Sequence, residues 1–169
     1  MAAEYFPCVF QLEGVDHYVI WYSDDRDGLV REGGRVVSFS SLAQLYAYAK
    51  PRSLTVQTAE VARYDWDSVA RWCDEPVMTE IAVDRLLKAW NMVLDAMPPG
   101  DEPGLFSHAN ARATDLYDKL FRANNLPAMT PPGAEYCPVW TRAELVALAQ
   151  LLRLGLAEMR LQLNGREAV

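Results

Sequence analysis

The residues of this chain that could do chemistry are few and scattered. Its two histidines, His17 and His108, lie far apart in the sequence. Neither belongs to an HExxH metal motif or lies near a GxSxG nucleophile turn or a glycine-rich phosphate loop, the patterns with which many enzymes hold their reacting groups. The acids between Asp24 and Gly28 are spaced in part as in a calcium loop, but they lack its ligand order and its distal glutamate. We predict no catalytic residue and no metal site.

The cysteines and the paired acids also indicate neither a metal site nor a catalytic site. Cys8, Cys73 and Cys137 form no CxxC or Cys/His pattern, which favours reduced, buried thiols over disulfides or zinc ligands. Asp65 and Asp67 could act as an acid and a base, but neighbouring acids near a helix end more often complement the helix dipole or contact solvent. We therefore predict that the chain is not an enzyme and needs no cofactor.

The clearest chemical feature is an excess of acid in the middle of the chain. The 169 residues include 23 Asp and Glu against 16 Lys and Arg, for a net charge of -7. Seven carboxylates between residues 60 and 84 are opposed only by Arg63 and Arg71, and the turn at residues 23–28 adds three more. These acids are either the solvated faces of helices or a surface complementary to a basic partner. Such a charge opposes direct contact with nucleic-acid phosphates.

If the acids face a partner, they should meet its Lys or Arg side chains while exposed aromatic residues anchor the contact. Tyr64 and Trp66 are the aromatic candidates because each lies beside acids in the sequence. The predicted contact residues are Asp24, Asp25, Asp27, Tyr64, Asp65, Trp66, Asp67, Asp74, Glu75 and Glu80.

The elements that must position these residues change character along the chain. β-Branched and aromatic runs predict strands at residues 8–12, 17–22, 35–39 and 54–58, with turns at 13–16 and at the Gly33–Gly34 pair, where residues 28–32 could form the partner strand. Between them, Ser41 and Gln44 predict the start of a helix that Pro51 ends. Residues 1–60 are thus strand-rich with one helix.

Residues 61–169 are predicted to be helical. Asp65 can cap a helix with an apolar stripe of Trp66, Val69, Ala70 and Cys73. Apolar residues at helical spacing continue over 83–97 and 113–120, and a capping box of Thr141 and Glu144 begins a long last helix. The loop at residues 98–104 breaks the chain. We expect one α+β domain over residues 1–169, with a small antiparallel sheet in its N-terminal part packed against about five helices.

Four segments carry a resemblance to a known family. They are FSSLAQLYAYAK at residues 39–50, YDWDSVARW at 64–72, VDRLLKAWNMVLDA at 83–96 and LYDKLFRANNLP at 116–127. In the order and spacing of their aromatic, amide and apolar positions they resemble the immunity proteins of bacterial contact-dependent growth inhibition systems, over roughly residues 36–140. We interpret the motif positions of this resemblance as scaffold; they are Trp72, Leu86, Trp90, Asn91, Asp95, Leu120, Asn124 and Asn125.

The resemblance implies a function without an active site. Such proteins are small and cytoplasmic, and each neutralises the C-terminal domain of one cognate toxin, commonly a nuclease that attacks tRNA or DNA. We accordingly expect this chain to block a basic nuclease sterically and electrostatically, without touching nucleic acid or membrane. The absence of a signal-like N-terminus and of any apolar run of about 18 to 20 residues also favours the cytoplasm.

Two other functions stay open. A small acidic chain with an apolar last helix also suits a secretion chaperone, or an adaptor that dimerises through that helix. An enzyme would need a pocket that joins His17 or His108 to a carboxylate, and no spacing in the sequence predicts one.

Overall fold

Two long antiparallel strands form the centre of the sheet in the computed structural model, which describes residues 3–58, 60–97 and 111–163. β1 (Glu4–Leu12) pairs with β2 (Val15–Ser23) along its whole length. The turn residues Glu13 and Gly14 both have a positive φ, 55° and 74°, as in the type I′ turns that match the twist of a hairpin. The predicted hairpin is confirmed, with longer strands and a tighter turn.

Short strands complete the sheets. They are β3 (Gly28–Leu29), β4 (Arg31–Glu32), β5 (Arg35–Val36), β6 (Ser38–Phe39) and β7 (Ala62–Asp65). β3 and β6 pair antiparallel with β2, β7 pairs parallel with β1, and β4 pairs with β5 as a separate hairpin. The turn of that hairpin is the Gly33–Gly34 pair, with φ of 58° and 81°, so the second predicted hairpin is also confirmed.

The strand predicted at residues 54–58 does not form as a strand. Residues 54–58 form only a single bridge, between Val56 and Tyr5, and β7 takes the place next to β1. β7 is short and partly exposed and carries Arg63 and Asp65, so it lacks the apolar run from which a strand is predicted. Its pairing with β1 joins segments far apart in the sequence, and it leads directly into a helix.

Five α-helices lie in the described ranges: α1 (Leu42–Ala49), α2 (Trp66–Asp74), α3 (Glu80–Asp95), α4 (Ala111–Ala123) and α5 (Arg142–Leu163). The predicted caps are confirmed. The Ser41 hydroxyl accepts from the Gln44 amide at 3.3 Å, and the Thr141 and Glu144 side chains each accept from the other's amide. Pro51 lies in the 3₁₀ turn η1 (Lys50–Arg52) that ends α1. The predicted break at 98–104 lies outside the described residues.

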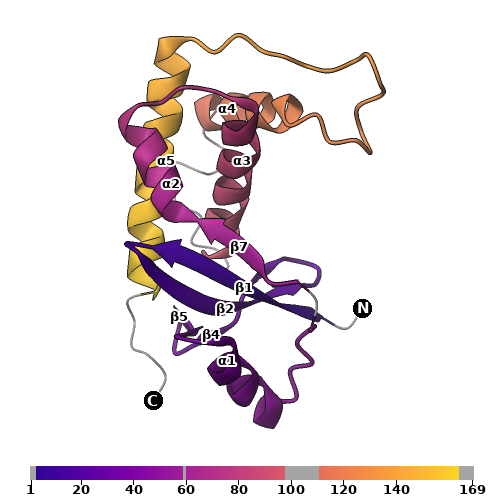
Figure 1. Ribbon diagram of the computed structural model, residues 1–169, viewed down its shortest axis with the longest axis vertical. Helices are drawn as coiled ribbons and strands as arrows, with labels where there is room; N and C mark the ends of the chain where they lie inside the picture. The colour runs from indigo at the N-terminus through magenta and orange to yellow at the C-terminus, as the bar shows by residue number, and fades with distance from the viewer. Residues whose placement is uncertain (1–2, 59, 98–110, 164–169) are drawn as a thin grey trace.

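The sheet lies between α1 on one side and α2, α3, α4 and α5 on the other (Figure 1), and an apolar core fills each side. Because successive side chains of a strand point to opposite faces, Val19 packs in the core shared with α2, α3, α4 and α5, while Ile20 packs in the core shared with α1. Leu86, Trp90 and Leu120 are buried in the larger core, as their interpretation as scaffold requires. The α+β fold class is confirmed, and no helix within the described ranges is long and apolar enough to cross a bilayer.

Arg31 ties the small hairpin to the ends of two helices. Its guanidinium donates to the Ala96 carbonyl, just after α3, and to the Gln162 side chain of α5 at 2.8 Å. A cation at this place also complements the negative end of the α3 dipole. The C-terminal turn of α3 is therefore fixed against the β4–β5 hairpin, which sets the position of the last α3 side chains.

Candidate functional site

The predicted acidic turn lies on the surface next to β2. Asp24, Asp25 and Asp27 are all exposed, and the Ser23 hydroxyl donates to Asp27 Oδ1 at 2.9 Å. These three carboxylates are accessible to a partner.

Asp65 and Asp67 hold the fold together locally. Asp65 caps α2, and burial opposes its ionisation, but hydrogen bonds from the Ser68 hydroxyl and amide keep its pKa below the ordinary value. The Asp67 carboxylate accepts from the Glu13 and Gly14 amides at 2.6 and 2.8 Å. The oxygens of both acids are therefore already engaged in caps and turns, which is the usual role of acids at such places.

The interpretation of Trp66 as an exposed anchor is wrong. Its side chain is 1% exposed and belongs to the larger core, and its indole N–H has no hydrogen-bond partner in the part of the chain that the structure describes. Tyr64, the other aromatic candidate, is half-buried and meets Phe10 edge-on, with ring centroids 5.4 Å apart. Burial raises the pKa of Tyr64 to about 12.

The remaining predicted acids lie away from the turn. Asp74 and Glu75 are exposed at the far end of α2, roughly 13 Å along the helix axis from Asp65 at 1.5 Å per residue. Asp74 pairs with Arg153 of α5 at 3.0 Å. Glu80 begins α3, and its side chain is outside the described part of the structure. The ten predicted residues therefore do not form one continuous patch.

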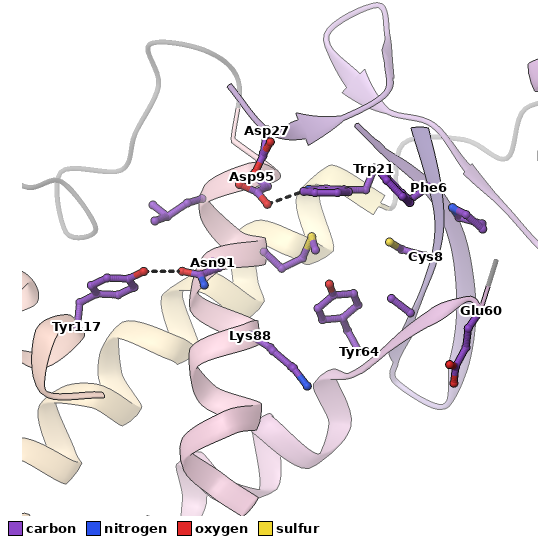
Figure 2. A pocket seen from close by; sticks show the side chains of 14 residues that line it. Phe6, Cys8, Trp21, Asp27, Glu60, Tyr64, Lys88, Asn91, Asp95 and Tyr117 are labelled. Atoms are coloured by element: carbon purple, nitrogen blue, oxygen red, sulfur yellow. Dashed lines mark hydrogen bonds between the residues drawn. The ribbon is translucent and has the colours of Figure 1, made fainter. Parts of the chain in front are cut away.

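A cleft of about 550 Å³ opens between the sheet and α3 (Figure 2). It brings Asp27 and Tyr64 from the predicted set together with residues that were not predicted to contact a partner. Aromatic walls come from Phe6, Trp21, Tyr64 and Tyr117, and the polar lining side chains are Asp27, Glu60, Lys88, Asn91 and Asp95. Three carboxylates and one ammonium group thus share an aromatic cleft.

Asp95 is the central polar group of this cleft. Its carboxylate, at the last residue of α3, is half-buried and accepts from Trp21 Nε1 at 3.0 Å. Burial raises the pKa of Asp95, and the Asp27 carboxylate raises it further, while the Trp21 hydrogen bond and the Arg26 guanidinium act in the opposite direction. A carboxylate held this way is poorly solvated, so an added positive charge would stabilise it.

The neighbours of Asp95 are held in place by their own contacts. Phe6 and Trp21 lie with ring centroids 5.4 Å apart, and the Tyr117 hydroxyl donates to Asn91 Oδ1 at 3.0 Å. The Lys88 ammonium pairs with Asp84 at 2.8 Å on the exposed side of α3. Figure 2 shows Asp95 and Lys88 of α3 on the side of Trp21 and Tyr64, and Asn91 turned toward Tyr117 of α4.

A smaller hollow of about 270 Å³ shares Tyr64 and Lys88 with the cleft. Its further lining includes Arg63, Asp65, Asp84 and Arg85. Arg63 is paired with Asp16 at 2.7 Å and Lys88 with Asp84, so charges here are largely matched within the protein. Across the described ranges, no three His, Cys, Asp or Glu side chains lie close enough together to hold a metal ion.

Asp95 and Asn91 were interpreted from the sequence as scaffold, and their place in the cleft was not predicted. A signal was present: Asp84, Lys88, Asn91 and Asp95 recur at helical spacing and form a polar stripe on a helix whose other residues, apart from Glu80 and Arg85, are apolar. Asn125 does act as scaffold, since its side-chain amide exchanges hydrogen bonds with the Tyr136 backbone.

Comparison with known proteins assigns no family. No known protein family profile matches the chain, and no curated protein matches its sequence. Among solved structures, the C-terminal domain of SatS, crystallised in complex with bromine, is similar with a TM-score of 0.46 and 16% identity over 92% of this chain and 90% of that one. A likeness of this degree assigns neither a fold family nor a function.

Proposed function

We propose that this chain is an immunity protein of a contact-dependent growth inhibition system, which binds one cognate toxin domain in the cytoplasm and neutralises it. The observation that carries the proposal is the open cleft between the sheet and α3, where carboxylates and aromatic side chains lie together. Aromatic anchors beside charged groups are what a protein-binding hot spot needs. The action is stoichiometric, and no bond is made or broken.

Charge supports a basic nuclease as the target. The chain has a net charge of -7, and the exposed turn at Asp24, Asp25 and Asp27 adds negative charge at one edge of the cleft. A nuclease binds phosphate and therefore has a basic surface. Opposite charges speed the encounter of the two proteins and reject partners of the wrong charge.

The proposal is tested with the protein encoded by the neighbouring reading frame, which is the candidate toxin. We expect that protein to stop growth when expressed alone, and to copurify with this chain and lose its toxicity when both are expressed. A neighbour that is harmless alone, or that does not copurify, would refute the proposal.

Two double charge reversals locate the contact. Asp24→Lys with Asp25→Lys changes the turn beside the cleft, and Asp74→Lys with Glu75→Lys makes the same change of charge at the far end of α2. Toxin affinity at low and high salt should fall for the first pair and much less for the second, since screening is strong beyond a Debye length of about 10 Å at 0.1 M salt. Equal losses would assign the effect to net charge alone.

A secretion chaperone or adaptor is the second candidate. The observation that favours it is an exposed apolar row on α5, where Val146, Leu154 and Leu161 are 38%, 47% and 70% exposed. Their spacing puts them on one face of the helix. An adaptor that uses this row would lose its partner or its dimer on Leu154→Lys, whereas toxin binding at the cleft would be unchanged.

A further inference from the structure

We propose that the cleft is a receptor for one guanidinium group, the side chain of an arginine of the partner, with Asp95 as its counter-ion and Phe6, Trp21 and Tyr64 as its aromatic walls. This inference deepens the proposed function and rests on it for the identity of the partner. The binding chemistry itself is a property of the cleft and is measurable on this chain alone.

The first reason is the state of the Asp95 carboxylate. Trp21 Nε1 donates to Oδ2 at 3.0 Å, and none of the ion pairs between described residues includes Asp95. Half-buried carboxylates are costly without a cation or several hydrogen bonds. A guanidinium presents several N–H donors in a plane and fits a carboxylate better than any other side chain does.

The second reason is the aromatic lining. Phe6 and Trp21 form a tilted pair, and Tyr64 from β7 and Tyr117 from α4 complete the wall. Flat cations stack on aromatic faces within about 6 Å of the ring centroid. An apolar ligand would satisfy the rings but leave the carboxylate uncompensated, and an anion would be repelled by it.

The third reason is the charge balance at the mouth of the cleft. Asp27, Glu60 and Asp95 line the cleft, and Lys88 is the only cation among the described residues of its lining. Lys88 is held by Asp84 at 2.8 Å, one helical turn away, with 61% of its side chain exposed. The Lys88 ammonium group therefore leaves the Asp95 carboxylate to a guest. Lys88 and the Arg26 guanidinium, which acts on Asp95 from the turn after β2, both repel that guest at long range.

Because the Asp95 carboxyl must be ionised to attract the guanidinium, the affinity for it should depend on pH. The groups that act on Asp95 or respond to it come from every element around it: Cys8 of β1, Trp21 of β2, Arg26 and Asp27 of the following turn, Tyr64 of β7 and Tyr117 of α4. Burial raises the pKa of Asp95 in the free protein, and a bound cation would lower it again. Binding should therefore weaken as pH falls through the Asp95 pKa of the free protein.

The test uses Nα-acetyl-arginine N-methylamide, an arginine whose amino and carboxyl groups are blocked so that only the side chain is charged. Binding is followed by the NMR chemical shift of the Trp21 indole N–H. We expect a saturable shift of that signal. The uncharged isostere Nα-acetyl-citrulline N-methylamide should cause none, and the corresponding lysine compound should bind more weakly. No saturable shift with the arginine compound, or an equal shift with citrulline, would overturn the inference.

Two variants and one control test whether the Asp95 charge itself carries the binding. Asp95→Asn retains an oxygen that can accept from Trp21 but removes the charge, so the arginine compound should bind at least tenfold more weakly. Lys88→Gln removes the repelling cation, so binding should strengthen. Glu32→Gln removes one negative charge on β4, where Glu32 pairs with Arg52, and should leave binding unchanged. If Glu32→Gln weakens binding as much as Asp95→Asn does, a general charge effect replaces the site.

Stability separates loss of the site from loss of the fold. Since the folded-state pKa of Asp95 is raised, the folded protein loses stability as the pH rises above the ordinary, unfolded-state pKa of this carboxyl, and the loss is complete once the pH exceeds the raised folded-state value. Asp95→Asn should thus unfold at a higher temperature than the wild type at neutral pH, and the difference should disappear in acid. An Asp95→Asn protein that binds less only because it is less stable would contradict the assignment.

The Asp95→Asn variant also tests the arginine receptor separately from the proposed immunity function. With the toxin in hand, Asp95→Asn should weaken the complex by at least about thirtyfold, the lower bound for removing one partner of a buried charge pair. A toxin that binds the variant as tightly as the wild type would refute the arginine receptor and leave the immunity function standing. If the chain binds the arginine compound but no toxin for it exists, the arginine receptor stands and the immunity function is refuted.

Discussion

The most informative stability prediction concerns Asp67, whose two oxygens accept from the Glu13 and Gly14 amides at 2.6 and 2.8 Å. These bonds hold the β1–β2 turn, in which Glu13 adopts a φ of 55° that costs a non-glycine residue roughly 1 kcal/mol or more. Asp67→Ala removes both acceptors. Each charge-assisted bond contributes about 1.5 to 3 kcal/mol when protected from water, but these amides are exposed and become hydrated in the variant.

The expected loss is therefore that of a side-chain cap, about 2 kcal/mol. For a chain of this length that loss lowers the melting temperature by roughly 4 to 8 °C, measured by calorimetry. Asp67→Asn keeps one acceptor and should lose about half as much. As a control, Asp118→Ala on the exposed face of α4 should change stability by less than about 0.5 kcal/mol. If Asp67→Ala melts like the wild type but binds toxin less well, our structural interpretation of Asp67 is wrong.

Three further predictions concern the core, one cap and the thiols. Leu86 is fully buried, so Leu86→Ala should lower the free energy of unfolding in urea by about 2 to 5 kcal/mol; a smaller loss would contradict its place in the core. Lys119 and the Thr141 amide hold the pKa of Glu144 at about 2, so the stability lost in Glu144→Gln should be full above the ordinary value near 4.5, and should vanish as pH falls to about 2. The prediction of buried thiols is confirmed for Cys8 and Cys73 and wrong for Cys137, which is exposed. A thiol reagent should therefore modify Cys137 and spare Cys8 and Cys73, whose pKa values burial raises to about 12 and 11; rapid reaction of all three in the native protein would contradict this.

Local signals in the sequence were sufficient for the turns and caps. The Gly33–Gly34 turn, the Ser41 cap and the Thr141–Glu144 capping box depend on residues within a few positions of one another, so their chemistry is readable without the rest of the fold. β7 was missed because it is a strand only through its pairing with β1, which overrides its weak local preference.

The site was only partly predictable for the same reason. Trp66 lies on the apolar stripe of α2 that the sequence itself indicates, and such a stripe faces the core; its position beside two acids was the misleading signal. The contact of Trp21 with Asp95 joins residues 74 positions apart. Its existence depends on how α3 crosses the sheet, which periodicity alone does not determine.

The most direct test of the account is hydrogen exchange of this chain with and without the purified cognate toxin domain. We predict that the toxin protects the amides of residues 20–30 and 88–95, on the two sides of the cleft, at one toxin per chain. Protection confined to α5, or a complex that leaves both of these segments exchanging as in the free protein, would contradict the claim that the acidic aromatic cleft is where the partner binds.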